Sequence, residues 1–311
     1  MVQSSTIAAF LRLGTRGSPL ALAQAGEVRA RLAAALGRDP AEIEIKVIRT
    51  SGDVIQDRPL TEEGGKGLFT KEIEEALLAG AIDLAVHSAK DLPTVLPDGL
   101  MLAACLERED PRDVFISRKA KTLGALPPGA TLGTASLRRQ AIAKRARADL
   151  NVVPLRGNVE TRLRKLDDTT MSATILALAG LKRLGIADRA TTIMSVEEFL
   201  PAVGQGAIAL ETRENDERTR AAIAVVDHAD TSVAIAAERA FLAELDGSCK
   251  TPIAGHATIS GATIRFRGLI AKPDGSAAHD IAGTGARGDA VRIGADAGRE
   301  LKARGGPGFF E

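Results

Sequence analysis

The sequence predicts an α/β protein with two mostly parallel-sheet domains, followed by a small C-terminal α+β domain. Strand-like and helix-like segments alternate through the first two thirds of the chain, and this alternation restarts near residue 130. After about residue 229 the pattern changes to paired strands and a final helix. Such alternation favours parallel sheets covered by helices, and 311 residues suffice for about two to three domains.

The first domain is predicted to begin with a strand and a helix. Ser18 and Pro19 suit the N-cap and the first helical position, and Gly37 ends the apolar stripe that follows. The segment 51–67 is polar and glycine-rich without a period of its own, so we expect a loop that is either a lid or a disordered segment. The predicted elements of this domain are strands at 10–15, 42–50 and 82–86 and helices at 19–36 and 69–77.

The second domain repeats the pattern, and the third departs from it. The segments 106–113 and 196–206 are expected to cross between the first two domains, after which a strand at 207–213 returns to the first sheet. The predicted domains are 1–106 with 207–224, 112–200, and 229–311. Their further elements are strands at 130–134, 151–155, 172–179, 256–260 and 262–276 and helices at 137–148, 159–166, 232–245 and 289–304.

Composition excludes several classes of function. With 41 basic and 40 acidic side chains and neither tryptophan nor tyrosine, a nucleic-acid partner is not expected. No apolar run is long enough for a membrane span, and the first residues do not form a secretory signal. We therefore expect a cytoplasmic protein, although a removed transit peptide stays possible. The four histidines and two cysteines form no spaced ligand set, so no metal is expected.

Arginine recurs where the predicted strands end. In open parallel sheets ligands bind beyond the carboxyl ends of the strands, often at the N-termini of helices. Guanidinium groups bind carboxylates or phosphates through paired hydrogen bonds, so the set predicts a ligand with several acidic groups, although any one arginine alone would be read as a solvated surface charge. The residues that follow predicted strands are Arg16, Ser18, Ser88, Lys90, Asp91, Ser136, Arg138, Arg139, Arg156, Arg162 and Arg183.

Two further features carry chemistry of their own. Lys90 and Asp91 directly follow a buried strand; they could form a structural ion pair, or Asp91 could steady a cation or move a proton during a reaction. Cys249 lies beside Lys250 in the loop "DGSCKTP" and suits a nucleophile or an attachment point, whereas Cys105 has apolar neighbours typical of a core residue.

Nine segments together resemble the porphobilinogen deaminase family, also called hydroxymethylbilane synthase. In chain order, from about residue 11 to 258, they are "LGTRGSPLALAQA", "GGKGLFTKEIEEALL", "HSAKDLP", "EREDPRDVFIS", "GTASLRRQ", "LRGNVETRL", "LALAGLKRLG", "PAVGQGAIALE" and "DGSCKTPIAGHA". The resemblance implies an enzyme that joins four porphobilinogen molecules head to tail into hydroxymethylbilane and releases ammonia at each step. It also implies a dipyrromethane cofactor, held by a thioether to Cys249, on which the chain grows.

The resemblance implies roles for particular residues. Asp91, Lys90 and Arg16 would be catalytic, with Asp91 stabilising the positive charge that forms when ammonia leaves. The cofactor would contact Cys249, Lys90, Asp91, Ser136, Arg138, Arg139, Arg156, Arg162, Arg183 and Gly206. The substrate would contact Arg16, Ser18, Phe69, Ser88, Arg156 and Gln205, with Gln205 also near a hinge.

The expected partners are small molecules: porphobilinogen and the growing polycarboxylate tetrapyrrole, bound by a monomer. The main alternative is a two-lobed binding protein for a polycarboxylate, because double crossovers between two lobes also describe type II periplasmic-binding-protein-like folds. That alternative predicts a secretory signal and gives Cys249 no role.

Overall fold

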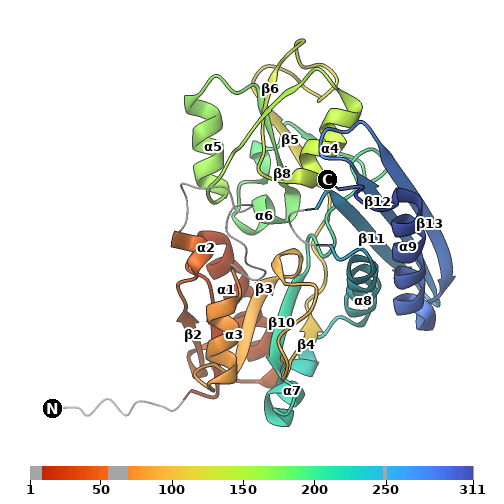
Figure 1. Ribbon diagram of the computed structural model, residues 1–311. Helices are drawn as coiled ribbons and strands as arrows, with labels where there is room; N and C mark the ends of the chain where they lie inside the picture. Colours follow the sequence, from red (N-terminus) through yellow and green to blue (C-terminus); the bar gives the residue numbers. More distant parts are fainter. Residues whose placement is uncertain (1–8, 55–68, 248–250, 311) are drawn as a thin grey trace.

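The computed structural model describes residues 9–54, 69–247 and 251–310. Figure 1 shows two α/β lobes, one above the other, with a third unit along one side of both. Two five-stranded sheets and one three-stranded sheet form their centres. The fold class predicted from the sequence is therefore confirmed: two parallel-rich α/β units and a small C-terminal α+β unit.

The first sheet has the order β2-β1-β3-β10-β4. β1, β2 and β3 are parallel, whereas β10 runs antiparallel to both β3 and β4. β10 has this direction because the chain returns from the second lobe at the carboxyl end of β3, where Ile208 pairs with Ser88. The strands are β1 (Leu11–Thr15), β2 (Ile43–Val47), β3 (Leu84–Ser88), β4 (Leu100–Cys105) and β10 (Ile208–Arg213).

The second sheet repeats this plan in the order β7-β6-β8-β5-β9. β6, β7 and β8 are parallel, and β5 is the antiparallel strand that directly follows the first crossover. Its first residue, Asp113, pairs with Ala177 at the carboxyl end of β8. The strands are β5 (Asp113–Ser117), β6 (Thr131–Gly133), β7 (Asn151–Val153), β8 (Ala173–Ala177) and β9 (Thr192–Ile193).

Helices cover both faces of the first sheet. Val28 and Leu32 of α1 pack on Leu84 and Val86, while Ile73 and Leu77 of α3 pack on the opposite face. Alternate side chains of a strand point to opposite faces, which makes β3 apolar on both sides. The helices of the two lobes are α1 (Pro19–Leu36), α2 (Ser51–Val54), α3 (Lys71–Leu78), α4 (Leu137–Ala146), α5 (Val159–Asp168), α6 (Leu178–Arg183) and α7 (Glu217–Ile223).

The third unit is an antiparallel sheet, β11-β12-β13, with two helices packed on it and on each other. Phe241 of α8 lies against Phe266 with ring centroids 5.0 Å apart. Ile235 of α8 also joins an apolar cluster with Ala89 and Leu92 of the first lobe. The elements are α8 (Ala229–Glu244), β11 (Ile253–Ser260), β12 (Thr263–Ala271), β13 (Ala278–Ala286) and α9 (Ala290–Gly305).

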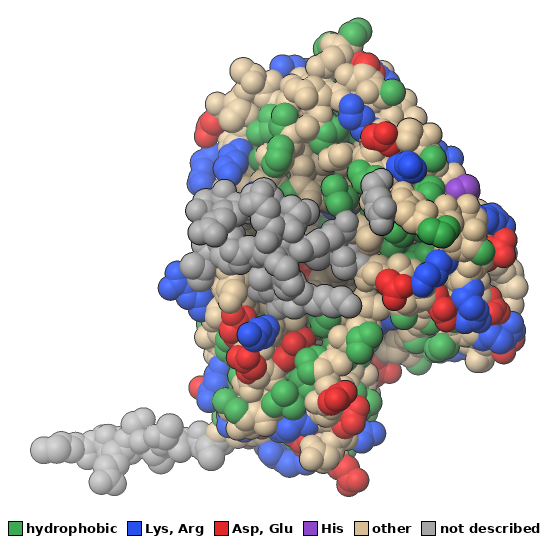
Figure 2. All heavy atoms as spheres, viewed as in Figure 1, with side chains coloured by type: hydrophobic (Ala, Val, Ile, Leu, Met, Phe, Trp, Pro, Cys, Tyr) green, Lys and Arg blue, Asp and Glu red, His purple; other side chains and the backbone are tan. Residues whose placement is uncertain are grey.

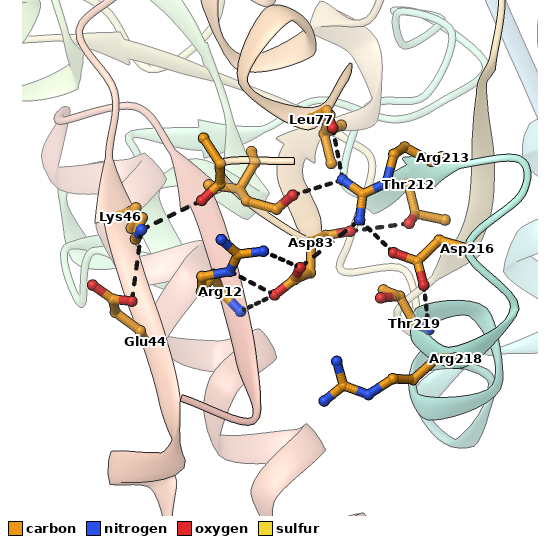
Figure 3. Close-up of polar contacts among 12 residues, drawn as sticks. Arg12, Glu44, Lys46, Leu77, Asp83, Thr212, Arg213, Asp216, Arg218 and Thr219 are labelled. Atoms are coloured by element: carbon orange, nitrogen blue, oxygen red, sulfur yellow. Dashed lines mark hydrogen bonds and ion pairs between the residues drawn. The ribbon is translucent and has the colours of Figure 1, made fainter. Parts of the chain in front are cut away.

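A network of ion pairs joins the amino ends of β1 and β3 to β10 and α7 (Figure 3). Arg12 donates to Asp83 through its side chain, with Nη2 2.6 Å from Oδ1, and through its backbone N–H. Burial alone would raise the pKa of Asp83, but the hydrogen bonds and charge of Arg12 bring it below the ordinary value. Arg213 lies 3.8 Å from the same carboxylate and also pairs with Asp216 at the start of α7. The network therefore holds together the end of the first sheet that lies opposite to the carboxyl ends of β1 and β3.

The structure differs from the predicted elements in a few places. β4, β5, β9 and β13 are strands, and α6 and α7 are helices, that the sequence pattern did not separate from their surroundings. Residues 51–54 form one helical turn rather than a loop, because the Ser51 N–H and hydroxyl both donate to Glu72 on α3. The rest of the predicted lid, 55–67, lies outside the described residues.

Candidate functional site

A cavity of about 690 Å³ lies between the carboxyl ends of the two sheets. Its lining includes the residues after β1 and β3 from the first lobe and the ends of β8 and the starts of α5 and α6 from the second. This is where ligands are expected in open α/β sheets, and its volume is in the range of a small-molecule site.

The lining is strongly cationic. Among the lining residues that the structure describes, Asp91 is the only acid. Figure 2 shows basic and acidic side chains interspersed over the visible surface, in keeping with the near-zero net charge of the chain. The cavity differs from this surface, because the charged side chains of its lining are mostly cationic. Its cations are Arg16, Arg49, Lys90, Arg139, Arg156, Arg162 and Arg183. Sequence reasoning missed Arg49, which follows β2 and could have been found by the same strand-end rule.

Helix N-termini add backbone donors at or beside the cavity. Ser18 caps α1 by accepting from the Ala21 N–H at 3.3 Å, and Asn158 caps α5 by accepting from the Thr161 N–H at 2.8 Å. Ser136 caps α4 in the same way, accepting from the Arg139 N–H at 3.3 Å. A helix N-terminus carries partial positive charge, so α1 and α5 strengthen the attraction for anions.

Lys90 and Asp91 occupy the short turn after β3. The Lys90 Nζ atom donates to Gln205 Oε1 over 3.4 Å, while the Asp91 side chain is exposed and faces the cavity. Burial, and next the positive charge of Arg139, lowers the pKa of Lys90 to about 8, although Asp91 opposes the shift. The two side chains therefore differ. The Lys90 ammonium is hydrogen-bonded to Gln205 at the cavity wall, whereas the Asp91 carboxylate is exposed in the cavity.

Behind the lining, one carboxylate binds two of the predicted arginines. Asp113 Oδ2 accepts from Arg138 Nη2 at 2.8 Å, and Asp113 Oδ1 accepts from Arg139 Nη2 at 2.7 Å. Gln205 Nε2 donates to Oδ1 of the same carboxylate at 3.1 Å. Burial would raise the pKa of Asp113, but the two guanidinium groups hold it below the ordinary value. Asp113 was assigned to a crossover by sequence reasoning, which gave no signal for this role.

Arg138 and Gln205 therefore lie behind the cavity wall. Arg138 is 4% exposed, and besides Asp113 it donates to the Leu200 carbonyl at 2.7 Å. Gln205 is 1% exposed, and it donates to the Pro111 carbonyl at 2.7 Å. Arg139 reaches both places, since it binds Asp113 and also lines the cavity.

The glycines of "VGQG" permit the crossover to pass close to the Lys90 turn. Gly204 and Gly206 have φ of +74° and +92°, which favour glycine. A Cβ on Gly204 would lie 2.8 Å from the Lys90 N atom, and one on Gly206 would lie 2.3 Å from the Glu109 carbonyl oxygen. Gly206 lines the cavity, so substitution there would displace its wall.

The remaining predicted residues meet at the same cavity. Arg16 stacks on Phe69, with its Cζ 4.2 Å from the ring centroid. Ser88 exchanges hydrogen bonds with Gln24 of α1, the shorter being 2.8 Å. Arg162 donates to the Gly157 carbonyl at 2.8 Å, and burial lowers its pKa to about 10.

The two cysteines fall in different settings. Cys105 is 1% exposed at the end of β4, and burial raises the pKa of its thiol to about 12, which makes it a poor nucleophile. The expectation that it is an inert core residue is confirmed. Cys249 lies outside the described residues, two positions after Gly247. Within the described ranges no helix is long and apolar enough to cross a bilayer, and no three potential metal ligands gather in one place.

Together, the fold and the cavity define a two-lobed α/β protein with a cationic site for a ligand that carries several acidic groups. A family model described as "Porphobilinogen deaminase, dipyromethane cofactor binding domain" matches residues 11–221, and one described as "Porphobilinogen deaminase, C-terminal domain" matches residues 232–303. The chain belongs to the porphobilinogen deaminase family, whose members are hydroxymethylbilane synthases. This decides against the alternative of a two-lobed binding protein.

Curated relatives agree with this assignment. The chain is 62% identical to porphobilinogen deaminase of Nitrobacter winogradskyi, covering 96% of this chain and 94% of the relative. It is 61% identical, with the same coverage, to that of Nitrobacter hamburgensis. Among solved structures, the methionine binding protein MetQ aligns with 68% of this chain and 89% of its own at a TM-score of 0.41 and 16% identity. A putative methionine-binding lipoprotein of Bacillus subtilis aligns with 70% and 90% at a TM-score of 0.43 and 14% identity.

Proposed function

We propose that the cavity between the two lobes holds the dipyrromethane cofactor and the growing pyrrole chain while porphobilinogen units are added. The observation that carries this proposal is the imbalance of charge in the lining: among the described residues that line the cavity there are seven cations and one carboxylate, that of Asp91. Each pyrrole ring brings an acetate and a propionate, so a growing chain is a polycarboxylate that needs such a lining. A neutral or cationic ligand would leave these charges uncompensated.

The residues present fit the cofactor. Its two rings carry four carboxylates, and Arg139, Arg156, Arg162, Arg183 and Lys90 offer donors around one space of suitable volume. When bound, the group supplies the pyrrole carbon to which the first porphobilinogen is joined. The proposed cofactor contacts also include Ser136, Arg138 and Gly206. Of these, Arg138 supports the site through Asp113 and Ser136 through the start of α4.

Cys249 is the proposed attachment point. The sequence contains two cysteines, and the buried, weakly acidic Cys105 is unsuited to form a thioether. The segment that leads to Cys249 follows α8, which packs against the turn that carries Lys90 and Asp91.

We assign the chemistry of ammonia loss to Asp91. Its carboxylate is exposed to the cavity among cationic side chains, where it can offset the positive charge that develops on the substrate. Lys90, held by Gln205, anchors a carboxylate beside it. Arg16 and Phe69, with Ser18 and Ser88, form the wall at which porphobilinogen binds.

The proposal extends to organisation and setting. We propose the domain division 1–106 with 207–224, 112–200, and 229–311, with the cavity between the first two domains and the cofactor cysteine in the third. The working unit is proposed to be a cytoplasmic monomer, because both lobes of the cavity come from one chain.

Intact-protein mass spectrometry with peptide mapping tests the attachment. We expect the purified protein to exceed its sequence mass by one dipyrromethane, located on the peptide that contains Cys249. The matched variants are Cys249→Ala, which should lack the added mass, and Cys105→Ala, which should retain it. An active protein without any covalent addition would contradict the proposal.

A further inference from the structure

The turn that carries Asp91 is tied directly to the loop that leads to Cys249. Thr94, three residues after Asp91, donates from Oγ1 to the Gly247 carbonyl at 2.6 Å. Gly247 is the last described residue before Cys249. Thr94 and Gly247 are 153 positions apart in the sequence, so this is a tertiary contact that joins the first lobe to the third unit.

A second contact holds the same turn from the same helix. Arg239 of α8 donates through Nη2 to the Pro93 carbonyl at 2.9 Å and to the Thr94 carbonyl at 3.0 Å. α8 ends at Glu244, three residues before Gly247. The helix therefore binds the residues after Asp91 through Arg239, and its C-terminal end leads to Gly247, which binds Thr94.

Apolar packing makes this junction firm. Ile235 of α8 is fully buried in a cluster with Leu92, the residue next to Asp91, and with Cys105 and Ala89. The hydrogen bonds from Arg239 can fix the position of the turn only if α8 is itself held in place. The packing of Ile235 against Ala89 and Leu92 holds α8 against the first lobe.

We propose that Thr94 and Arg239 are positioning residues that hold the Asp91 carboxylate at a constant place relative to the cofactor-bearing loop. The inference rests on the proposed attachment at Cys249. It explains how one carboxylate can serve successive additions: the turn is held to Gly247, where the loop begins, so changes elsewhere in the cavity need not alter the distance between the turn and that anchor point. Thr94 touches no reacting atom in this account and acts through the loop and the turn that it joins.

The experiment compares Thr94→Val, which keeps the shape and removes the hydroxyl, with Thr94→Ser, which keeps the hydroxyl. Thr258→Val, at an exposed threonine of β11, is the matched control. For each protein we would measure the fraction of Cys249 that carries the cofactor, the melting temperature, and kcat and KM per loaded molecule. Iodoacetamide labelling of Cys249 in protein produced without porphobilinogen, so that the thioether has not formed, adds a measurement that does not depend on turnover.

We expect Thr94→Val to lower kcat by about fivefold, the effect of one lost neutral hydrogen bond expressed in the transition state. Its KM should stay close to that of the parent, because the arginines that bind the chain are untouched, and its melting temperature should fall by no more than about 2–4 °C, the effect of one hydrogen bond on stability. Thr94→Ser should restore kcat, Thr258→Val should change nothing, and the labelling rate of Cys249 should differ between Thr94→Val and Thr94→Ser. Arg239→Lys, which keeps the charge but cannot reach both carbonyls in the same way, should also lower kcat.

An unchanged kcat in fully loaded Thr94→Val, or a Thr94→Ser variant as slow as Thr94→Val, would overturn the inference. Those outcomes would leave the cofactor on Cys249 and the proposed function intact. A parent protein without cofactor on Cys249 would overturn both, so the two failures are distinguishable.

Discussion

Arg183 of α6 and Glu27 of α1 form an ion pair between the two lobes, with Nε 3.1 Å from Oε2. Arg183 also donates through Nη2 to the Gly206 carbonyl at 3.0 Å, and only 9% of its side chain is exposed. Arg183, a cavity-lining guanidinium from the second lobe, is thus bound by a carboxylate from the first lobe. A substrate carboxylate that uses Arg183 must compete with Glu27 for it.

Replacement of Glu27 by glutamine should therefore strengthen binding of acidic ligands. The pair is partly exposed, so its loss should lower KM for porphobilinogen by about two- to fivefold. Steady-state kinetics would measure this effect. Because Glu27 also pairs with Arg31 at 2.9 Å, Arg31→Gln serves as a control that keeps the Arg183 contact and should leave KM unchanged. A higher KM in Glu27→Gln would contradict this account.

Lys90 should make binding depend on pH on the alkaline side. Its pKa of about 8 in the folded protein means that the ammonium is charged below pH 8 and loses its proton as the pH rises through that value. We expect KM to rise by about tenfold from about pH 7 to about pH 9.5, as one charged hydrogen bond to a carboxylate is lost. Lys90→Arg stays protonated over this range, so its KM should be flat. A flat profile in the parent protein as well would exclude Lys90 as a carboxylate anchor.

Much of the fold could be predicted from periodicity. The stripe from Ala21 to Leu32 and the Ser18 cap gave α1 nearly to the residue, and the apolar run before His87 gave β3 within two residues. β5 was missed because Asp113 and Arg112 border it, and a buried acid at a strand end has the sequence appearance of a loop. Its burial depends on Arg138 and Arg139, which are 25 and 26 positions away.

The site was predictable where its chemistry follows strand ends, as with Arg16, Lys90 and Arg156. Such a rule places residues at one edge of a sheet, but it does not say which guanidinium faces the ligand. Arg138 and Arg139 are adjacent in sequence and differ in role because successive helical side chains point about 100° apart, and Arg138 is directed toward Leu200. Glu27 has no local signal, since an acid at a partly exposed helical position is ordinary in any sequence.

Removal of the Asp113 charge should destabilise the protein. Asp113→Asn would leave Arg138 and Arg139 buried without their counter-ion, and breaking such a pair costs about 3–5 kcal/mol in the free energy of unfolding. Urea denaturation would measure the change, with Asp98→Asn on the exposed turn before β4 as the control. A loss below about 1 kcal/mol would show that the guanidinium groups find other partners.

The same carboxylate predicts an acid limit to stability. The pKa of Asp113 is lower in the folded protein than in the unfolded chain, so its contribution is fully present above the ordinary aspartate value of about 4. It is lost as the pH falls further toward the folded pKa, because protonation removes the ion pairs. Unfolding curves taken between about pH 6 and about pH 3 should show stability decreasing below about pH 4, more steeply than in Asp113→Asn. Parallel pH profiles in the two proteins would assign acid unfolding to other groups.

Asp91→Asn should separate binding from chemistry. The side chain is exposed in the cavity, so its replacement by an isosteric amide should leave the melting temperature unchanged. The amide cannot offset positive charge on the substrate or exchange a proton with it, so kcat should fall by about 100-fold or more while the carboxylate-binding arginines keep KM near its parent value. Steady-state kinetics on cofactor-loaded protein, with Asp98→Asn as the matched surface control, would measure both parameters. If Asp91→Asn instead raised KM and left kcat intact, Asp91 would act in binding alone and the positive charge would have to be stabilised by another group.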